Sequence, residues 1–351
     1  MKIIEEDVKN GVLKLQCETT DDLWVLYNVI REGDVIYAKT TREVKHRETG
    51  ESSRVPLVLG LSVKRVEFQE FTDKLRVSGI IVDGPEELGV KGKHHTLAVG
   101  VGDVITLIKE RWERHELEFI KRFSTRRPRV VIVAVDYDEV CVALLFEQGV
   151  KYAWEHTSNM PSKAYSVNYE DYLKRHVANI VTGVSEISVR EHCDVIIVAG
   201  PGELKYQVAS ALRERLELPV YTDSTSSGGC NGIREALSRD LVKKIAGEFQ
   251  LIKAREVFDL FKELLSRDPD IVRYGLEDVF EACQLGAVKT LVMVDDFLKS
   301  SSSEEFEKTN VLLKTAYEKK SEIYIIPSKS DLGYELSGFG GVVAILRFKI
   351  H

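Results

Sequence analysis

The segment 75–102 constrains the fold of this 351-residue chain more than any other stretch. Apolar residues predict a strand over Leu75–Val82, and the triplet Asp83-Gly84-Pro85 predicts a tight turn directly after it. A glycine-punctuated arm follows, and a second strand is expected to begin at Thr96. Taken alone, these residues indicate a β-hairpin element.

Short strands with frequent turn signals predict a small β-barrel domain over residues 1–125. One helix is expected at Asp21–Arg31, capped by Thr20 or Asp21, and another near Ile108–Phe123 closes the domain. The expected strands are Leu13–Cys17, Val35–Ala38, Leu57–Val63, Val66–Phe68, Leu75–Val82 and Thr96–Val101.

The rest of the chain mixes strands with helices, and its length is typical of two or three domains in all. The pattern predicts an α/β central domain over 130–245, a linking helix over 241–267 and an α-β-α sandwich over 268–351. The expected elements are strands Val130–Val135, Cys141–Phe146, Asp194–Ala199 and Pro219–Tyr221, helices Glu203–Arg215 and Gly232–Leu237, and then, alternating, helix Leu276–Leu285, strand Thr290–Val294, helix Glu304–Lys319, strand Ile323–Ile326, helix Asp331–Leu336 and strand Val342–Phe348.

The net charge of −7 argues against a surface coated in basic residues, although it allows a local basic patch. Five scattered cysteines without a C-x-x-C pair support neither a zinc site nor a disulfide framework, and they fit a reducing cytosol. The sequence shows no signal peptide and no apolar run long enough to span a bilayer, so we expect a cytoplasmic protein.

Blocks in family order resemble the Pelota family, the ribosome-rescue relatives of the class-I release factors of eukaryotes and archaea. The blocks are Tyr37–Val44, the VSG-IV-GPEE-G-KG-HHT run within 75–102, Asp194–Gly202 with Lys205, and Gly340–Phe348. The resemblance implies an Sm-like β-barrel domain, an RNase-H-like central domain and a C-terminal domain of the kink-turn-binding ribosomal-protein type. One departure is Glu203, where the family usually carries Phe after Pro-Gly.

Two release-factor motifs are missing from the chain. The tripeptide Gly-Gly-Gln, which positions water for ester hydrolysis, is absent, and Gly228-Gly229-Cys230 is interpreted as a helix-entry turn. The Asn-Ile-Lys-Ser element that reads stop codons is also absent. The sequence therefore resembles a tRNA-shaped factor that neither reads codons nor hydrolyses peptidyl-tRNA.

Two basic segments in the first domain are candidates for binding RNA. The segment 39–54 carries five basic residues against three acidic ones around a flexible tip, and a shorter segment follows at 91–94. Composition alone leaves a solvated hairpin as the alternative, whereas the resemblance implies a loop that probes the decoding centre. The candidate residues are Lys39, Arg42, Lys45, Arg47, Arg54, Lys91, Lys93 and His94. The adjacent His94 and His95 point to opposite faces of a strand, which argues against a metal site.

Three further sites are hypotheses. Asp136 and Asp194 could belong to a carboxylate cluster that holds two divalent ions, although carboxylates at a turn are ordinarily solvated. The resemblance suggests that the turn Gly200-Pro201-Gly202, with Lys205, faces a partner protein. In the strand ending at Phe348, alternation places Ile345 and Arg347 on one face, predicted to point outward and to hold a GTPase.

The resemblance implies a monomeric ribosome-rescue factor in mRNA surveillance that contacts ribosome, mRNA and rRNA. It would occupy an empty A site, delivered by a translational GTPase similar to elongation factor 1 alpha, and subunit splitting would involve an ABC-type recycling ATPase. No cofactor is required for this role. One alternative is an endoribonuclease that depends on Mg²⁺ or Mn²⁺, an activity attached to the family. The other is a peptidyl-tRNA-hydrolysing release factor.

Overall fold

The computed structural model describes residues 1–45, 52–124, 127–158, 169–247, 249–300 and 302–350, with backbone only for 42–45, 52–55 and 303. The chain divides into two compact units, one of Met1–Arg126 with Phe297–Lys319 and one of Arg127–Asp296 with Lys320–His351. The predicted boundaries at 130, 245 and 268 stay predictions. No helix among the described residues is long and apolar enough to cross a membrane.

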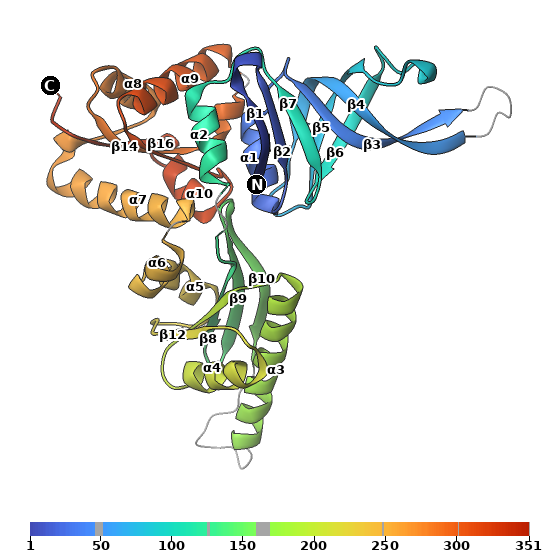
Figure 1. Ribbon diagram of the computed structural model, residues 1–351. Coiled ribbons are helices and arrows are strands. Elements are labelled where there is room, and N and C mark those ends of the chain that lie inside the picture. The colour runs from blue at the N-terminus through green and yellow to red at the C-terminus, as the bar shows by residue number, and fades with distance from the viewer. Residues whose placement is uncertain (46–51, 125–126, 159–168, 248, 301, 351) are drawn as a thin grey trace. The chain divides into compact units, whose positions relative to one another are not determined.

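The first unit is built on a seven-stranded antiparallel sheet in the order β1-β2-β7-β3-β4-β5-β6 (Figure 1). Alternate residues of its strands face a core that also receives helix α1, where Trp24 meets Phe119 and Phe123 edge to face. The strands are β1 Lys2–Asp7, β2 Val12–Gln16, β3 Val35–Lys45, β4 Ser52–Glu67, β5 Lys74–Asp83, β6 His94–Gly100 and β7 Val104–Ile108; the helices are α1 Thr20–Val29, α2 Arg114–Arg122 and α9 Ser303–Glu318, with short helices at Val8–Asn10 and Glu86–Leu88.

The second unit contains a five-stranded sheet in the order β10-β9-β8-β11-β12. Strands β8, β11 and β12 run parallel, and β9 and β10 are antiparallel. One face of β8 packs against α3 and α4, and α5 covers the other. The strands are β8 Val130–Val135, β9 Glu139–Phe146, β10 Gly149–Thr157, β11 Val195–Ala199 and β12 Val220–Asp223; the helices are α3 Tyr169–Arg190, α4 Leu204–Arg215, α5 Gly229–Leu237 and α6 Asp240–Ala246.

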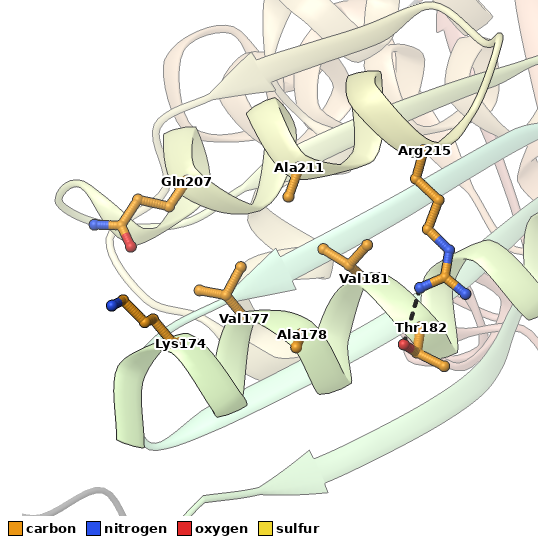
Figure 2. Close-up of a pocket in the computed structure, with 8 residues that line it drawn as sticks. All are labelled: Lys174, Val177, Ala178, Val181, Thr182, Gln207, Ala211 and Arg215. Carbon is orange, nitrogen blue, oxygen red and sulfur yellow. Dashed lines mark hydrogen bonds between the residues drawn. The ribbon is translucent and has the colours of Figure 1, made fainter. Parts of the chain in front are cut away.

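A groove of about 360 Å³ lies between α3 and α4, with Val177, Val181 and Ala211 among its lining residues and Lys174 and Arg215 toward its ends (Figure 2). Arg215 Nη1 donates to Thr182 Oγ1 over 3.0 Å, which ties the two helices together at one end. No residue proposed as a site from the sequence lines this groove.

The same unit contains a four-stranded sheet in the order β13-β16-β14-β15. Helices α7, α8 and α10 pack against it. The elements are α7 Gln250–Arg267, β13 Val272–Tyr274, α8 Leu276–Gln284, β14 Val288–Val294, β15 Glu322–Ile326, α10 Asp331–Ser337 and β16 Val342–Leu346, with a short helix at Pro269–Ile271. The short helix Asp295–Lys299 begins in this unit and ends in the first.

The α+β fold class is confirmed, and several predicted elements are wrong. The helix at 108–123 is the end of strand β7 followed by the shorter α2, because Ile108 pairs with Val12 and Val35 in the sheet. The linking helix at 241–267 is two helices, since Phe249 adopts an extended conformation between α6 and α7, and α7 packs on the third sheet. The first helix is capped by Thr19, whose backbone N–H, like that of Glu18, donates to Asp22.

Candidate nucleic-acid interface and partner surfaces

Strands β3 and β4 continue past the rest of the first sheet as a two-stranded arm, residues 39–45 and 52–58 (Figure 1). Strand β3 pairs with β7 only as far as Ala38, and β4 pairs with β5 only from Gly60. Beyond these points the β3–β4 ladder continues to Lys45 opposite Ser52. At about 3.3 Å per residue the arm reaches roughly 20 Å past its last neighbouring strand.

The arm carries the basic residues predicted to bind RNA. Lys39 is exposed at its base, Arg42 and Lys45 follow along β3, and Arg54 lies on β4 opposite Glu43 in the ladder. Arg47 lies outside the described residues. A narrow ribbon with basic residues on an outer strand pair can enter a groove lined by phosphates, and it needs no fixed base contacts to do so.

The second basic segment lies at the base of the same arm. Lys91, Lys93 and His94 are all exposed, and the start of β6 contacts β3. The ring Nε2 of His95 is 3.1 Å from Thr40 Oγ1, one residue from Lys39. The two segments predicted separately from the sequence therefore lie next to one another at the base of the arm.

One exposed basic residue that the sequence analysis did not single out, Arg76, lies away from this surface, opposite Glu67 of β4. Arg76 is exposed on β5 between the buried Leu75 and Val77 and lies opposite Ala98 of β6. The alternation of the predicted strand over 75–82 was signal enough to place Arg76 on the outer face. Arg65 on β4 also lies near this acidic residue, 3.0 Å from the carboxylate of Glu67, which offsets its charge.

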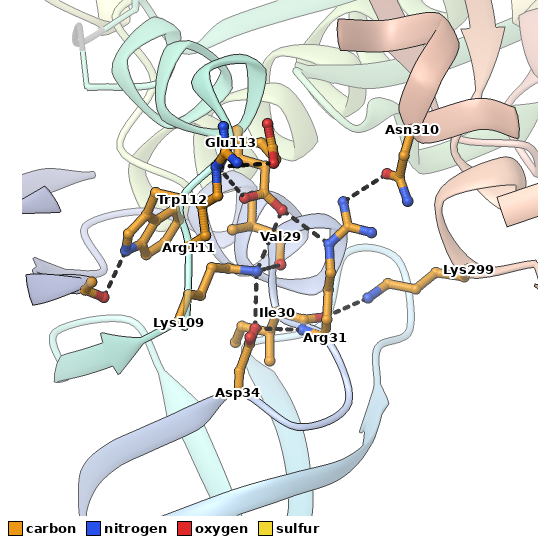
Figure 3. A network of polar contacts seen from close by, with 12 residues as sticks. Val29, Ile30, Arg31, Asp34, Lys109, Arg111, Trp112, Glu113, Lys299 and Asn310 are labelled. Carbon is orange, nitrogen blue, oxygen red and sulfur yellow. Dashed lines mark hydrogen bonds and ion pairs between the residues drawn. The ribbon is translucent and has the colours of Figure 1, made fainter. Parts of the chain in front are cut away.

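A largely buried network of polar contacts lies in the first unit and joins residues that follow α1 and β7 to a residue of α2 (Figure 3). Lys109, at the end of β7, lies 2.9 Å from Asp34 and 3.3 Å from Glu116, and Arg31 Nε donates to the same Glu116 oxygen over 2.9 Å. Lys299 donates to the carbonyl of Ile30 over 2.7 Å. Burial, with Arg31 and Lys109 nearby, lowers the pKa of Lys299 to about 7.

The carboxylate site built on Asp136 and Asp194 is wrong. Asp136 follows the last residue of β8, whereas Asp194 precedes the first residue of β11. Because β8 and β11 are parallel, with Val130 opposite Val195, the two residues lie at opposite ends of the sheet, roughly 20 Å apart. Two-metal sites hold their ions about 4 Å apart, so these carboxylates cannot share one.

Replacing Asp136 and Asp194 together by Asn is therefore expected to leave any RNA cleavage by the protein unchanged. Each carboxylate accepts a local backbone hydrogen bond, from Tyr137 and from Arg129, and neither can complete a metal site with the other. Labelled RNA incubated with Mg²⁺ or Mn²⁺ tests this, with Asp138→Asn at the same turn as control. Loss of cleavage in a folded double variant alone would restore the nuclease interpretation.

The described residues contain one group with the spacing of metal ligands, and the sequence did not predict it. The ligand atoms of Cys141, Glu155 and Cys230 lie within 4.8 Å of one another. Two sulfurs and one carboxylate differ in kind from the all-oxygen set that Mg²⁺ prefers.

Only part of the turn 200–202, which was predicted to face a partner protein, is exposed on the surface. Pro201 is half-buried and Gly202 is exposed, but Lys205 is 3% exposed and donates to the carbonyls of Gly200 and Gly202 over 2.9 and 2.8 Å. Lys205 therefore closes the turn from inside and cannot contact a partner, which corrects the prediction. Tyr206 beside it is 48% exposed and was not predicted.

The prediction that Ile345 faces outward is also wrong. Strand β16 lies between β13 and β14, and Ile345 is 7% exposed because helices cover the sheet. The strand ends at Leu346, so Arg347 and Phe348 lie beyond it and are exposed. Arg347 donates to the carbonyl of Lys320 over 3.0 Å. Of the predicted pair, only Arg347 lies on the surface.

Comparison with known proteins identifies the class of protein. The family model of the Pelota N-terminal domain matches residues 1–124, and that of eRF1 domain 3 matches residues 251–350. The crystal structure of Pelota from Thermoplasma acidophilum superposes with a TM-score of 0.75 over the full length of both chains, at 23% identity. Dom34 of S. cerevisiae, a translation termination-like factor that interacts with Hbs1, superposes with a TM-score of 0.53 at 19% identity over all of this chain and 99% of its own. The chain therefore has the fold of these Pelota and Dom34 structures.

Sequence relatives narrow this class to one family. The pelota homologue of Desulfurococcus amylolyticus is 45% identical over 350 residues, which cover all of this chain and 98% of the relative. That of Staphylothermus marinus is 41% identical with the same coverage. The chain belongs to the Pelota family.

Proposed function

We propose that this protein rescues stalled ribosomes in no-go and non-stop mRNA surveillance, by entering the empty A site and promoting subunit dissociation without peptide release. The observation that carries the proposal is the basic two-stranded arm, continued at its base by Lys91, Lys93 and His94, on a chain of the Pelota family. The protein acts in the cytoplasm as a monomer, and its ligands are mRNA and rRNA phosphates.

The arm suits a vacant mRNA channel better than a codon. Phosphate contacts position a protein on RNA without reading its sequence, and a ladder that ends in basic residues offers many such contacts. An arm of this kind can enter any mRNA channel that is empty, and its binding does not depend on the mRNA sequence. This explains how rescue proceeds at any stalled position.

The partners in this proposal are a translational GTPase similar to elongation factor 1 alpha and an ABC-type recycling ATPase. Arg347, exposed after the end of β16, is the residue that we assign to GTPase contact, while Pro201 and Gly202 form the exposed part of the central turn. Arginine beside an exposed aromatic, here Phe348 at 50% exposure, is a common composition of interfaces.

Peptidyl-tRNA is expected to stay intact when the protein acts on programmed ribosomes. Gly228 and Gly229 enter helix α5, and the next residue is Cys230, whose sulfur lies against Cys141. No glutamine is presented there to orient water. The test combines two measurements on stalled ribosomes, subunit splitting with the GTPase and ATPase present, and hydrolysis of labelled peptidyl-tRNA.

Splitting without hydrolysis supports the proposal. Hydrolysis above the uncatalysed rate would place the protein among release factors instead, and absence of both activities would reject rescue. A release factor assayed in parallel shows that the ester is accessible in the same ribosomes.

A further inference from the structure

Two cysteines far apart in the sequence meet in the central domain. Cys141 lies on β9 and Cys230 in the first turn of α5, separated by 89 residues, and their sulfurs are 2.7 Å apart. Non-bonded heavy atoms pack at about 3.5–4.0 Å, so the two sulfurs are closer than an ordinary van der Waals contact.

Glycines around Cys230 allow this approach. A Cβ on Gly232 would lie 2.9 Å from the Cβ of Ala134, and one on Gly229, where φ is +57°, would lie 2.4 Å from the carboxylate of Glu139. A side chain at Gly232 would push the start of α5 away from β8, and a side chain at Gly229 would be strained by the positive φ. The two glycines therefore permit the close packing that places Cys230 beside Cys141.

The two sulfurs differ in access. Cys141 is buried, Cys230 is half-buried, and the carboxylate of the exposed Glu155 lies beside both. Burial raises the pKa of both thiols, so at neutral pH each carries a proton that must leave before reaction. Cys230 is the sulfur that a reagent from solvent reaches, and Glu155 is placed to accept its proton.

We propose that Cys141 and Cys230 form an intramolecular disulfide, with a small-molecule disulfide as the oxidant. Cys230 loses its proton to Glu155 or water, and its thiolate attacks one sulfur of the oxidant, whose other half leaves as a thiolate. The Cys141 thiolate then attacks the Cys230 sulfur and displaces the second half. The protein loses two electrons and two protons, and the oxidant is reduced to two thiols.

A metal ion bridging the same residues fits less well. Two thiolates on one tetrahedral zinc ion, each bonded at about 2.3 Å, lie roughly 3.8 Å apart. The observed separation of 2.7 Å is shorter. The disulfide would fasten α5 to β9 and close an 89-residue loop, which restricts the unfolded chain.

The test uses the full-length protein, incubated with glutathione disulfide or with a phosphine reductant. After oxidation and denaturation, three of the five cysteines are expected to react with a thiol reagent, and peptide mapping should join the peptides of Cys141 and Cys230. The oxidised protein should melt roughly 5–15 °C higher than the reduced one. Cys230→Ser should abolish this difference, whereas Cys193→Ser, at another buried cysteine of the same domain, should keep it.

Three results would each overturn the proposal. They are five reactive thiols after oxidation, a mapped link between other cysteines, and a melting difference that persists in Cys230→Ser. Zinc in the reduced wild-type protein at one ion per chain, lost in Cys230→Ser, would assign the cluster to a metal instead. Mapping and thiol counting use the wild type, so they hold even if a variant folds poorly.

Discussion

Reversing the charges of Arg42, Lys45 and Arg47 together is expected to weaken ribosome binding by roughly two to three orders of magnitude at 0.1 M salt. Each phosphate contact contributes about 0.7–0.9 to the slope of log affinity against log salt, and hence a similar fraction of a decade in affinity at 0.1 M. The slope itself should fall by roughly two to three units. Equilibrium binding to ribosomes stalled on truncated mRNA, measured over a series of salt concentrations, gives both quantities.

A matched control separates the arm from net charge. Reversal of Lys174, Lys289 and Lys329, exposed residues of the second unit, changes the formal charge by the same amount. If both triple variants lose equal affinity, the arm has no particular role. If neither loses affinity and the slope is unchanged, the arm does not contact phosphate. A single Lys93→Glu substitution tests whether the base of the arm takes part.

Local pattern was enough for most strands of the first domain and for the existence of the arm. Leu75 and Val77 face the core, as the apolar pattern requires, and the same pattern implied the outward Arg76. The local pattern did not predict the length of strand β4, which the sequence divides into two shorter strands. Strand β4 runs unbroken over Ser52–Glu67, although Lys64 and Arg65 interrupt its apolar residues, because a bulge between Val63 and Arg65 absorbs the irregularity.

The candidate sites failed where they depended on long-range pairing. Asp136 and Asp194 suggest the carboxylate cluster of an RNase-H nuclease, but only the parallel direction of β8 and β11 reveals that they lie at opposite ends of the sheet. Ile345 was expected to face outward because β16 was treated as a strand with one free face. Helices α7, α8 and α10 all contact β16, and every residue of the strand is buried, so neither of its faces is free.

The contact between Cys141 and Cys230 is a long-range feature that the sequence did not predict. Spacing along the sequence gives no sign that Cys141 and Cys230 meet, since 89 residues separate them. In the sequence, the glycines near Cys230 indicate only a helix-entry turn without the release-factor glutamine. Their close approach to β8 and β9 is a property of three-dimensional packing.

Replacing Glu116 by Ala is expected to destabilise the first unit by about 3–5 kcal/mol at neutral pH. Glu116 and Lys109 are each 5% exposed, and Glu116 also accepts a hydrogen bond from Arg31. Truncation leaves Asp34 as the carboxylate beside the buried Lys109 and the neighbouring Arg31. It also removes the hydrogen bond that Glu116 accepts from the backbone N–H of Glu113, just before α2. Glu118→Ala, an exposed position on the same helix, is the control and should change the unfolding free energy by less than about 0.5 kcal/mol.

The pH dependence of this difference distinguishes a charge network from lost packing. Burial alone would raise the pKa of Glu116, but Lys109 and Arg31 overcome it and hold the pKa below its ordinary value. The stabilisation is thus fully present above the unfolded carboxylate pKa, near 4.3, and is lost as pH falls through the lower native value. Urea unfolding, followed by the fluorescence of Trp24 and Trp112 in this unit, should give a difference at neutral pH that shrinks below about pH 4. A difference that stays constant in acid would mean that Glu116 contributes by packing alone, and one below about 1 kcal/mol at neutral pH would show that the network adds little.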